Sequence, residues 1–146
     1  MFERIDRLVT KHGFSFQAWD DNYSKGVRAA LGTLENEVDT VRDLSSAGDC
    51  DMIPAMEYID SARWLPYSTG RTLIEAMSNL EAVLVSLPQE QLARGTNWSN
   101  MVFNAIDALK EAQRESKNYG ELDGKLSPLP TTYEDSLAQA RPTSDM

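Results

Sequence analysis

Hydrophobic positions along this chain recur mainly at intervals of three and four residues. The clearest stripe lies in the segment 25–45 and comprises Val27, Leu31, Leu34, Val38 and Val41. A second stripe has the same spacing and comprises Leu73, Met77, Leu80, Leu84 and Leu87. This spacing places the apolar side chains on one face of a helix. Both segments are therefore predicted to be long amphipathic helices.

Residues that begin or end helices divide the rest of the N-terminal half. Gly13 is suited to end a short first helix, because glycine readily adopts the left-handed conformation found there. The aromatic-rich segment 14–23 is expected to form a second short helix. Pro54 fits the first turn of a further helix that extends to about Trp64.

The C-terminal half carries clearer capping signals. Thr72 and Glu75 form a capping box immediately before the second stripe. Asn97 is suited to cap another long helix, which we expect to stop near Gly120. Beyond that point Gly124, Pro128, Pro130 and Pro142 interrupt a more polar segment.

No alternation of apolar and polar residues is long enough to predict a strand. The expected fold class is therefore all-α, a single-domain antiparallel bundle of about five to six helices. Residues 1–120 are expected to form the bundle. Residues 121–146 are expected to form a partly irregular tail that contains one short helix.

The acidic residues are concentrated in one segment. The whole chain has a formal net charge of −9, and residues 35–60 hold eight acidic residues against Arg42 alone, a net charge of −7. Direct binding to nucleic acid requires clustered basic residues. We therefore expect that this acidic chain does not bind nucleic acid directly. The expected partner is a basic protein surface.

Three of these carboxylates, those of Glu35, Asp39 and Asp43, are spaced four residues apart and stack along one helix face. Like charges at this spacing cost a few tenths of a kcal/mol per pair. Acidic groups near a helix C-terminus are also disfavoured by the helix dipole. Because stability does not explain this arrangement, it suggests a surface with a function.

The predicted contact surface comprises seven acidic residues of this segment: Glu35, Asp39, Asp43, Asp49, Asp51, Glu57 and Asp60. We interpret the chain as a non-enzymatic binding protein with an inhibitor, immunity-type or adaptor role. Its carboxylates would contact a basic groove, including one that normally holds nucleic acid. The simpler alternative is a solvated surface that maintains solubility.

The residues that usually carry catalysis are poorly placed. Cys50 lies between Asp49 and Asp51, and their negative charge disfavours the reactive thiolate. His12 is the single histidine, which leaves zinc sites and histidine-dependent nucleophiles without partner residues. We therefore expect no catalytic residues, metal site or cofactor.

Two other functions remain open. Glu57 and Asp60 could face Glu35 and Asp39 and hold Mg²⁺, as in all-α nucleotide pyrophosphohydrolases. Alternatively, the apolar stripes could pack between chains of a self-assembling structural protein. The expected oligomeric state is a monomer or a dimer.

The expected location is the cytoplasm. No apolar run approaches the roughly 20 residues that a membrane-spanning helix requires. The N-terminal sequence alternates acidic and basic residues and lacks the apolar segment of a signal peptide. A membrane is therefore not an expected partner.

Overall fold

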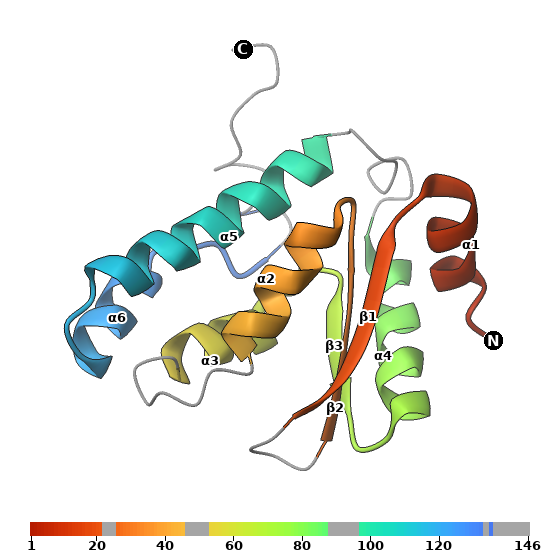
Figure 1. Cartoon of the computed structure of the whole chain (residues 1–146), viewed down its shortest axis with the longest axis horizontal. Helices are drawn as coiled ribbons and strands as arrows, with labels where there is room; N and C mark the ends of the chain where they lie inside the picture. Colours follow the sequence, from red (N-terminus) through yellow and green to blue (C-terminus); the bar gives the residue numbers. More distant parts are fainter. Residues whose placement is uncertain (22–25, 46–52, 88–96, 133–134, 136–146) are drawn as a thin grey trace.

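The computed structural model describes residues 1–21, 26–45, 53–87, 97–132 and 135. The elements follow the order α1 (Glu3–His12), β1 (Ser15–Asp21), β2 (Gly26–Gly32), α2 (Glu35–Ser45), α3 (Ile53–Ser61), β3 (Tyr67–Gly70), α4 (Leu73–Ser86), α5 (Asn97–Glu115) and α6 (Tyr119–Leu126) (Figure 1). The described part is thus mixed α and β, and the all-α prediction is wrong.

The three strands form one antiparallel sheet in the order β1-β2-β3. Helix α4 packs on one face of this sheet against β2 and β3, and α1 packs against α4. Helix α2 packs on the other face against β1 and β2, with α3 and α5 beyond it (Figure 1). The sheet therefore lies between two helical layers, and the buried core fills both sides of it.

The segment expected to be a second short helix is strand β1. Its alternation is hidden in the sequence because each side of the strand carries an apolar residue. Gln17 and Trp19 face α2, whereas Phe16 and Ala18 lie on the opposite face of the sheet. The predicted helix is therefore wrong over Ser15–Asp21.

The long helix expected in the segment 25–45 is a strand followed by a shorter helix. Val27 and Leu31 belong to β2, and Val38 and Val41 belong to α2. A spacing of four residues returns a side chain to the same face in a strand as well as in a helix. In addition, β2 is the central strand and is covered on both faces, so its apolar run shows no alternation.

The first turn of α2 is fixed by a buried carboxylate. Glu37, whose side chain lies at the third helical position, is only 2% exposed. Its carboxylate accepts the Thr33 N–H at 3.1 Å and the Thr33 hydroxyl at 2.6 Å. One of the eight acidic residues of the segment 35–60 is therefore part of the interior.

The N-cap predicted at Thr72 and the helix end predicted at Gly13 are confirmed. The Thr72 hydroxyl oxygen accepts the Glu75 N–H at 3.1 Å at the start of α4. Gly13 ends α1 with a φ of 70°, in the left-handed region. The α4 stripe was predicted less well, because Leu80 and Leu84 are buried but Leu73 is exposed.

The C-terminal helices enclose one side of the core. Helix α6 begins where the preceding long helix was expected to stop. The Asn118 side chain caps it by accepting the Glu121 N–H at 2.9 Å. Helix α6 packs against α3 and α5 and buries Leu122 and Leu126. The short helix expected in the tail lies mostly outside the described residues.

The two buried tyrosines predict how stability changes at alkaline pH. Burial raises the pKa of Tyr58 to about 12. Burial and the nearby Asp60 carboxylate raise the pKa of Tyr67. Both groups stay protonated in the folded chain after the unfolded chain begins to lose these protons, near pH 10. Stability should therefore fall as the pH rises above about 10, by at most about 1.4 kcal/mol per pH unit for each tyrosine.

Urea unfolding between pH 8 and pH 11.5 checks this expectation. The Tyr58→Phe variant should show a shallower pH dependence than wild type. Its absolute stability is a poor readout, because the Tyr58 hydroxyl also donates a hydrogen bond to the Pro130 carbonyl. Parallel profiles for the two proteins would contradict the assignment.

Candidate functional site

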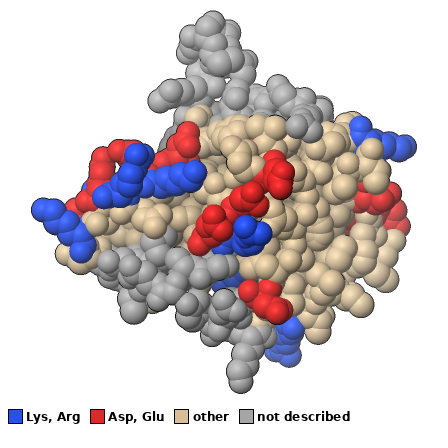
Figure 2. Space-filling model, in the orientation of Figure 1, with Lys and Arg blue, Asp and Glu red and all other residues tan. Residues whose placement is uncertain are grey.

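The predicted acidic row lies on the outer face of α2. Val38, Val41 and Leu44 are buried and hold the helix against the rest of the core. Glu35 and Asp43 are exposed, with Asp39 half-buried between them. Figure 2 shows acidic side chains in a row along this helix. The Cα atoms of successive acidic residues in the row are roughly 6 Å apart along the helix axis.

Strand β1 holds the row in place through one amide side chain. The Gln17 amide nitrogen donates to Asp39, and its amide oxygen accepts from Arg42 Nη1 at 2.8 Å. These bonds join the outer face of α2 to the edge strand of the sheet. The sequence gives no local signal for this connection, because Gln17 is 22 residues from Asp39.

Basic groups only partly neutralise the row. Arg42 lies 3.8 Å from Asp39 and 3.7 Å from Asp43. Lys110 of α5 borders a cleft of about 180 Å³ that Asp43 also lines. Exposed ion pairs at such distances contribute little free energy. The row therefore keeps a net negative charge, because Arg42 is the one basic residue of α2.

The other predicted contact residues are in different situations. Asp49 and Asp51 lie outside the described residues, as does Cys50 between them. Glu57 is exposed on α3. Asp60 lies one turn further along α3, and its carboxylate accepts hydrogen bonds from other side chains of the protein.

Asp60 neutralises a buried arginine from the central strand. Its Oδ1 accepts from Arg28 Nη1 at 2.8 Å and from the Tyr67 hydroxyl at 2.9 Å. Arg28 is only 5% exposed and also donates to the Tyr67 oxygen. Sequence reasoning missed this cluster. One sequence signal was available: Arg28 is the one charged residue in the run 26–34. A charged side chain in such an apolar run is expected to be buried and therefore to pair with an acidic residue.

The magnesium alternative requires the α2 and α3 carboxylates to converge. Within the part of the chain that the structure describes, no three His, Cys, Asp or Glu side chains are grouped closely enough to hold a metal ion. The Asp60 carboxylate is also turned toward Arg28 and Tyr67. The geometry thus offers this enzymatic reading no support.

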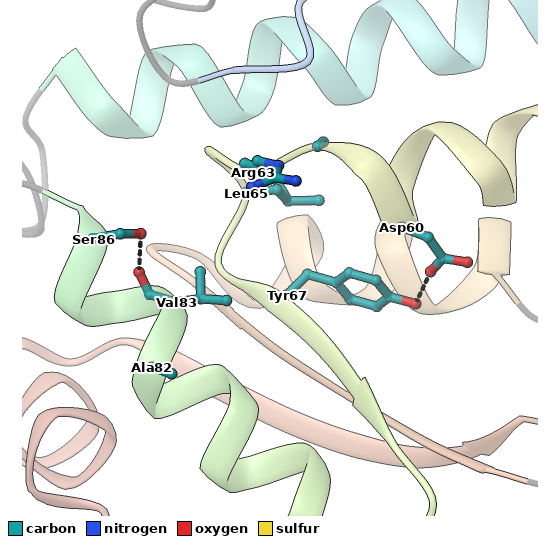
Figure 3. Close-up of a pocket in the computed structure, with 8 residues that line it drawn as sticks. Asp60, Arg63, Leu65, Tyr67, Ala82, Val83 and Ser86 are labelled. Atoms are coloured by element: carbon teal, nitrogen blue, oxygen red, sulfur yellow. Dashed lines mark hydrogen bonds between the residues drawn. The ribbon is translucent and has the colours of Figure 1, made fainter.

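A cavity of about 330 Å³ opens beside the edge strand β3. It lies between α4 and the end of α3, with Arg63 and Leu65 on one side (Figure 3). Its hydroxyl groups are already used, because Ser86 donates to the Val83 carbonyl and Tyr67 donates to Asp60. Asp60 also lines the cavity, and its carboxylate is paired with Arg28.

Comparison with known proteins adds no identity: no protein-family model, curated protein or solved structure matches the chain. None of the described helices combines the length and apolarity needed to cross a membrane. Any functional assignment must therefore rest on the charge, geometry and packing of the residues themselves.

Proposed function

We propose that this chain is a non-enzymatic binding protein whose acidic helical surface contacts a basic surface on another macromolecule. An inhibitor, immunity-type or adaptor role in the cytoplasm fits this proposal. The observation that carries it is the row of Glu35, Asp39 and Asp43 on α2, which the β1 side chain Gln17 holds in place.

The arrangement favours capture of cations over simple solvation. A helix that only maintains solubility can scatter its charges, but here three acidic residues share one face and Arg42 alone compensates them on this helix. A fixed row of carboxylates gives a field of one sign, which accelerates the approach of a basic partner and selects its orientation. A groove lined with Lys and Arg, of the kind that binds phosphates, is a suitable partner surface.

Glu57 extends the proposed surface onto α3, which packs beside α2. Asp49 and Asp51 belong to the same proposal on the strength of the sequence alone. In this proposal the role of Asp60 is mainly structural, because its carboxylate is paired with Arg28.

Charge reversal tests the proposed surface. The triple variant Glu35→Lys, Asp39→Lys and Asp43→Lys should bind a ten-residue lysine-rich peptide at least about tenfold more weakly at low salt, since several attractive contacts become repulsive. Titration calorimetry at several salt concentrations measures the affinity. The salt dependence of binding should also become smaller.

The matched control changes the same net charge elsewhere. Glu75, Asp107 and Asp123 are exposed on α4, α5 and α6. Their triple replacement by lysine should weaken binding much less than replacement of the α2 row. Equal losses in the two triple variants would mean that the peptide senses only net charge, and the proposed surface would then be wrong.

A further inference from the structure

The outer edge of β1 carries backbone N–H and C=O groups that pair with no strand in the described part of the chain. The Leu31 N–H donates to the Pro66 carbonyl at 2.9 Å, so the Leu31 backbone faces β3. Backbone direction alternates along a strand, so Ala30 faces β1, where its register partner is Gln17. The N–H and C=O groups of Ala18, the next β1 residue, therefore point away from the sheet.

By the same alternation, the backbone N–H and C=O groups of Phe16 and Asp20 also point away from the sheet. Among the described residues, no strand lies beside this edge, although β1 is seven residues long. Ala18 and Asp20 are exposed, and Phe16 is half-buried. Unprotected edges of this length invite pairing with another chain.

The opposite edge of the sheet is protected. Strand β3 has only four residues. The Asn79 side chain donates to the outward Thr69 carbonyl at 2.8 Å, and the Tyr67 N–H donates to the Leu65 carbonyl at 2.8 Å. The two edges therefore differ, and β1 is the one suited to accept another strand.

The acidic row lies directly beside the open edge. Gln17 of β1 contacts both Asp39 and Arg42 of α2, so the edge and the row form one surface. Figure 1 shows β1 at the front of the sheet, between α2 and α1. Figure 2, in the same orientation, shows largely uncharged surface on the β1 side of the row. One flank of the edge is thus acidic and the other is mainly uncharged.

We infer that β1 accepts an extended segment of a basic partner as a fourth strand of the sheet. The inference rests on the proposed function and specifies how the partner is held. Main-chain hydrogen bonds to the outward groups of Phe16, Ala18 and Asp20 provide affinity. The side chains of the bound segment provide specificity.

The spacings of the two elements are compatible. Alternate residues of an extended segment lie roughly 6.6 Å apart and share one face. Carboxylates four residues apart on α2 are roughly 6 Å apart along the helix axis. A segment with a basic residue at every second position can therefore place its cations toward α2. Its intervening apolar residues then face the side of Phe16 and Ala18.

Charge selects a basic partner over a second copy of this chain. Each copy has a net charge of −9, and self-pairing of β1 would bring two such chains together at their acidic flanks. Asp20 lies on the edge itself and adds to that repulsion. A basic segment replaces this repulsion with attraction.

A single proline tests the edge. Ala18→Pro removes an outward N–H but leaves the ladder between β1 and β2 intact, because proline is tolerated where the N–H faces away from the sheet. The control Ala18→Thr changes the side chain and keeps the N–H. The probe is an octapeptide of alternating lysine and valine, compared with the same peptide carrying proline at its two central valines.

Wild type and Ala18→Thr should bind the alternating peptide, whereas Ala18→Pro should bind at least about tenfold more weakly, the scale of one lost hydrogen bond with local steric interference. The proline-containing peptide should bind wild type comparably weakly. Amide exchange in wild type gives an independent readout. The Ala18 and Asp20 amides should exchange rapidly in the free protein and slowly in the complex.

The possible failures are distinguishable. If Ala18→Pro binds like wild type while the α2 triple variant loses binding, edge pairing is wrong and the acidic-surface proposal stands. If neither variant changes the affinity, both proposals are wrong. If the proline variant only dissociates a dimer in sedimentation, the edge pairs with a second copy and the inference fails. If that variant does not fold, the exchange measurement decides, and an unchanged Ala18 amide overturns the inference.

Discussion

Replacing Asp60 with alanine is expected to lower the free energy of unfolding by about 3 kcal/mol, because it leaves a buried guanidinium without its carboxylate. Arg28, the base concerned, is 5% exposed on the central strand. The Tyr67 hydroxyl loses the same acceptor. The Asp60 side chain itself is 45% exposed, which places the expected cost at the lower end of the range for buried pairs.

Glu57 provides the matched control on the same helix. It is exposed, and Glu57→Ala should change stability by no more than about 0.5 kcal/mol. Urea denaturation of both variants measures the difference. Equal stabilities would show that Asp60 does not compensate Arg28.

A double-mutant cycle isolates the pair. Arg28→Met removes the buried charge, so adding Asp60→Ala to it should cost much less than Asp60→Ala alone. The free energies of the single and double variants therefore give the coupling between these two side chains. If the free-energy costs of the two substitutions were additive, Asp60 would stabilise the fold through contacts other than its pair with Arg28.

Local signals explain the parts of the fold that were predictable. Helix caps depend on residues within one turn, and the boundaries at Gly13 and Thr72 were predicted for this reason. Strands depend on what covers each face. In β2, Ala29, Ala30 and Leu31 are all buried, because α4 covers one face and α2 covers the other. Periodicity alone could not separate this run from a helix.

The candidate site shows the same limit. The spacing of Glu35, Asp39 and Asp43 identified a row on one helix face, and the three residues do share a helix. The isolated Arg28 indicates that an acidic partner exists, but the spacing does not identify Asp60 as that partner, because the two residues are 32 positions apart. The open edge of β1 was equally hidden, since no sheet was expected.

Gly70→Ala is expected to lower the free energy of unfolding by about 3 kcal/mol or more, because overpacking of a tight interface forces backbone to move. An alanine Cβ at this position would lie 2.4 Å from the Ala76 nitrogen and 2.8 Å from the Glu75 carbonyl carbon. Both atoms belong to the backbone of α4, which cannot rotate away as a side chain can. The Ser68 hydroxyl also donates to the Ala76 carbonyl at 3.2 Å, so β3 and α4 are held closely together.

Gly124→Ala is the matched control for this substitution. A Cβ at Gly124, within α6, would meet no atom within 4 Å. Alanine favours helix over glycine, so this variant should be more stable than wild type by about 0.5–1 kcal/mol. Thermal and urea unfolding should therefore move in opposite directions for the two variants. A Gly70→Ala protein as stable as wild type would contradict the close approach of β3 to α4.

The Gly70→Ala variant also separates stability from binding. Gly70 pairs with Val27 at the β3 side of the sheet, and the proposed binding edge lies on β1, two strands away. At temperatures where the variant is folded, its affinity for the alternating peptide should match that of wild type. Ala18→Pro should show the reverse, with weaker binding and little loss of stability. This contrast would assign β3 a role in packing and β1 a role in binding, because the edge of β1 that faces away from β2 presents backbone groups to which a partner strand can bind.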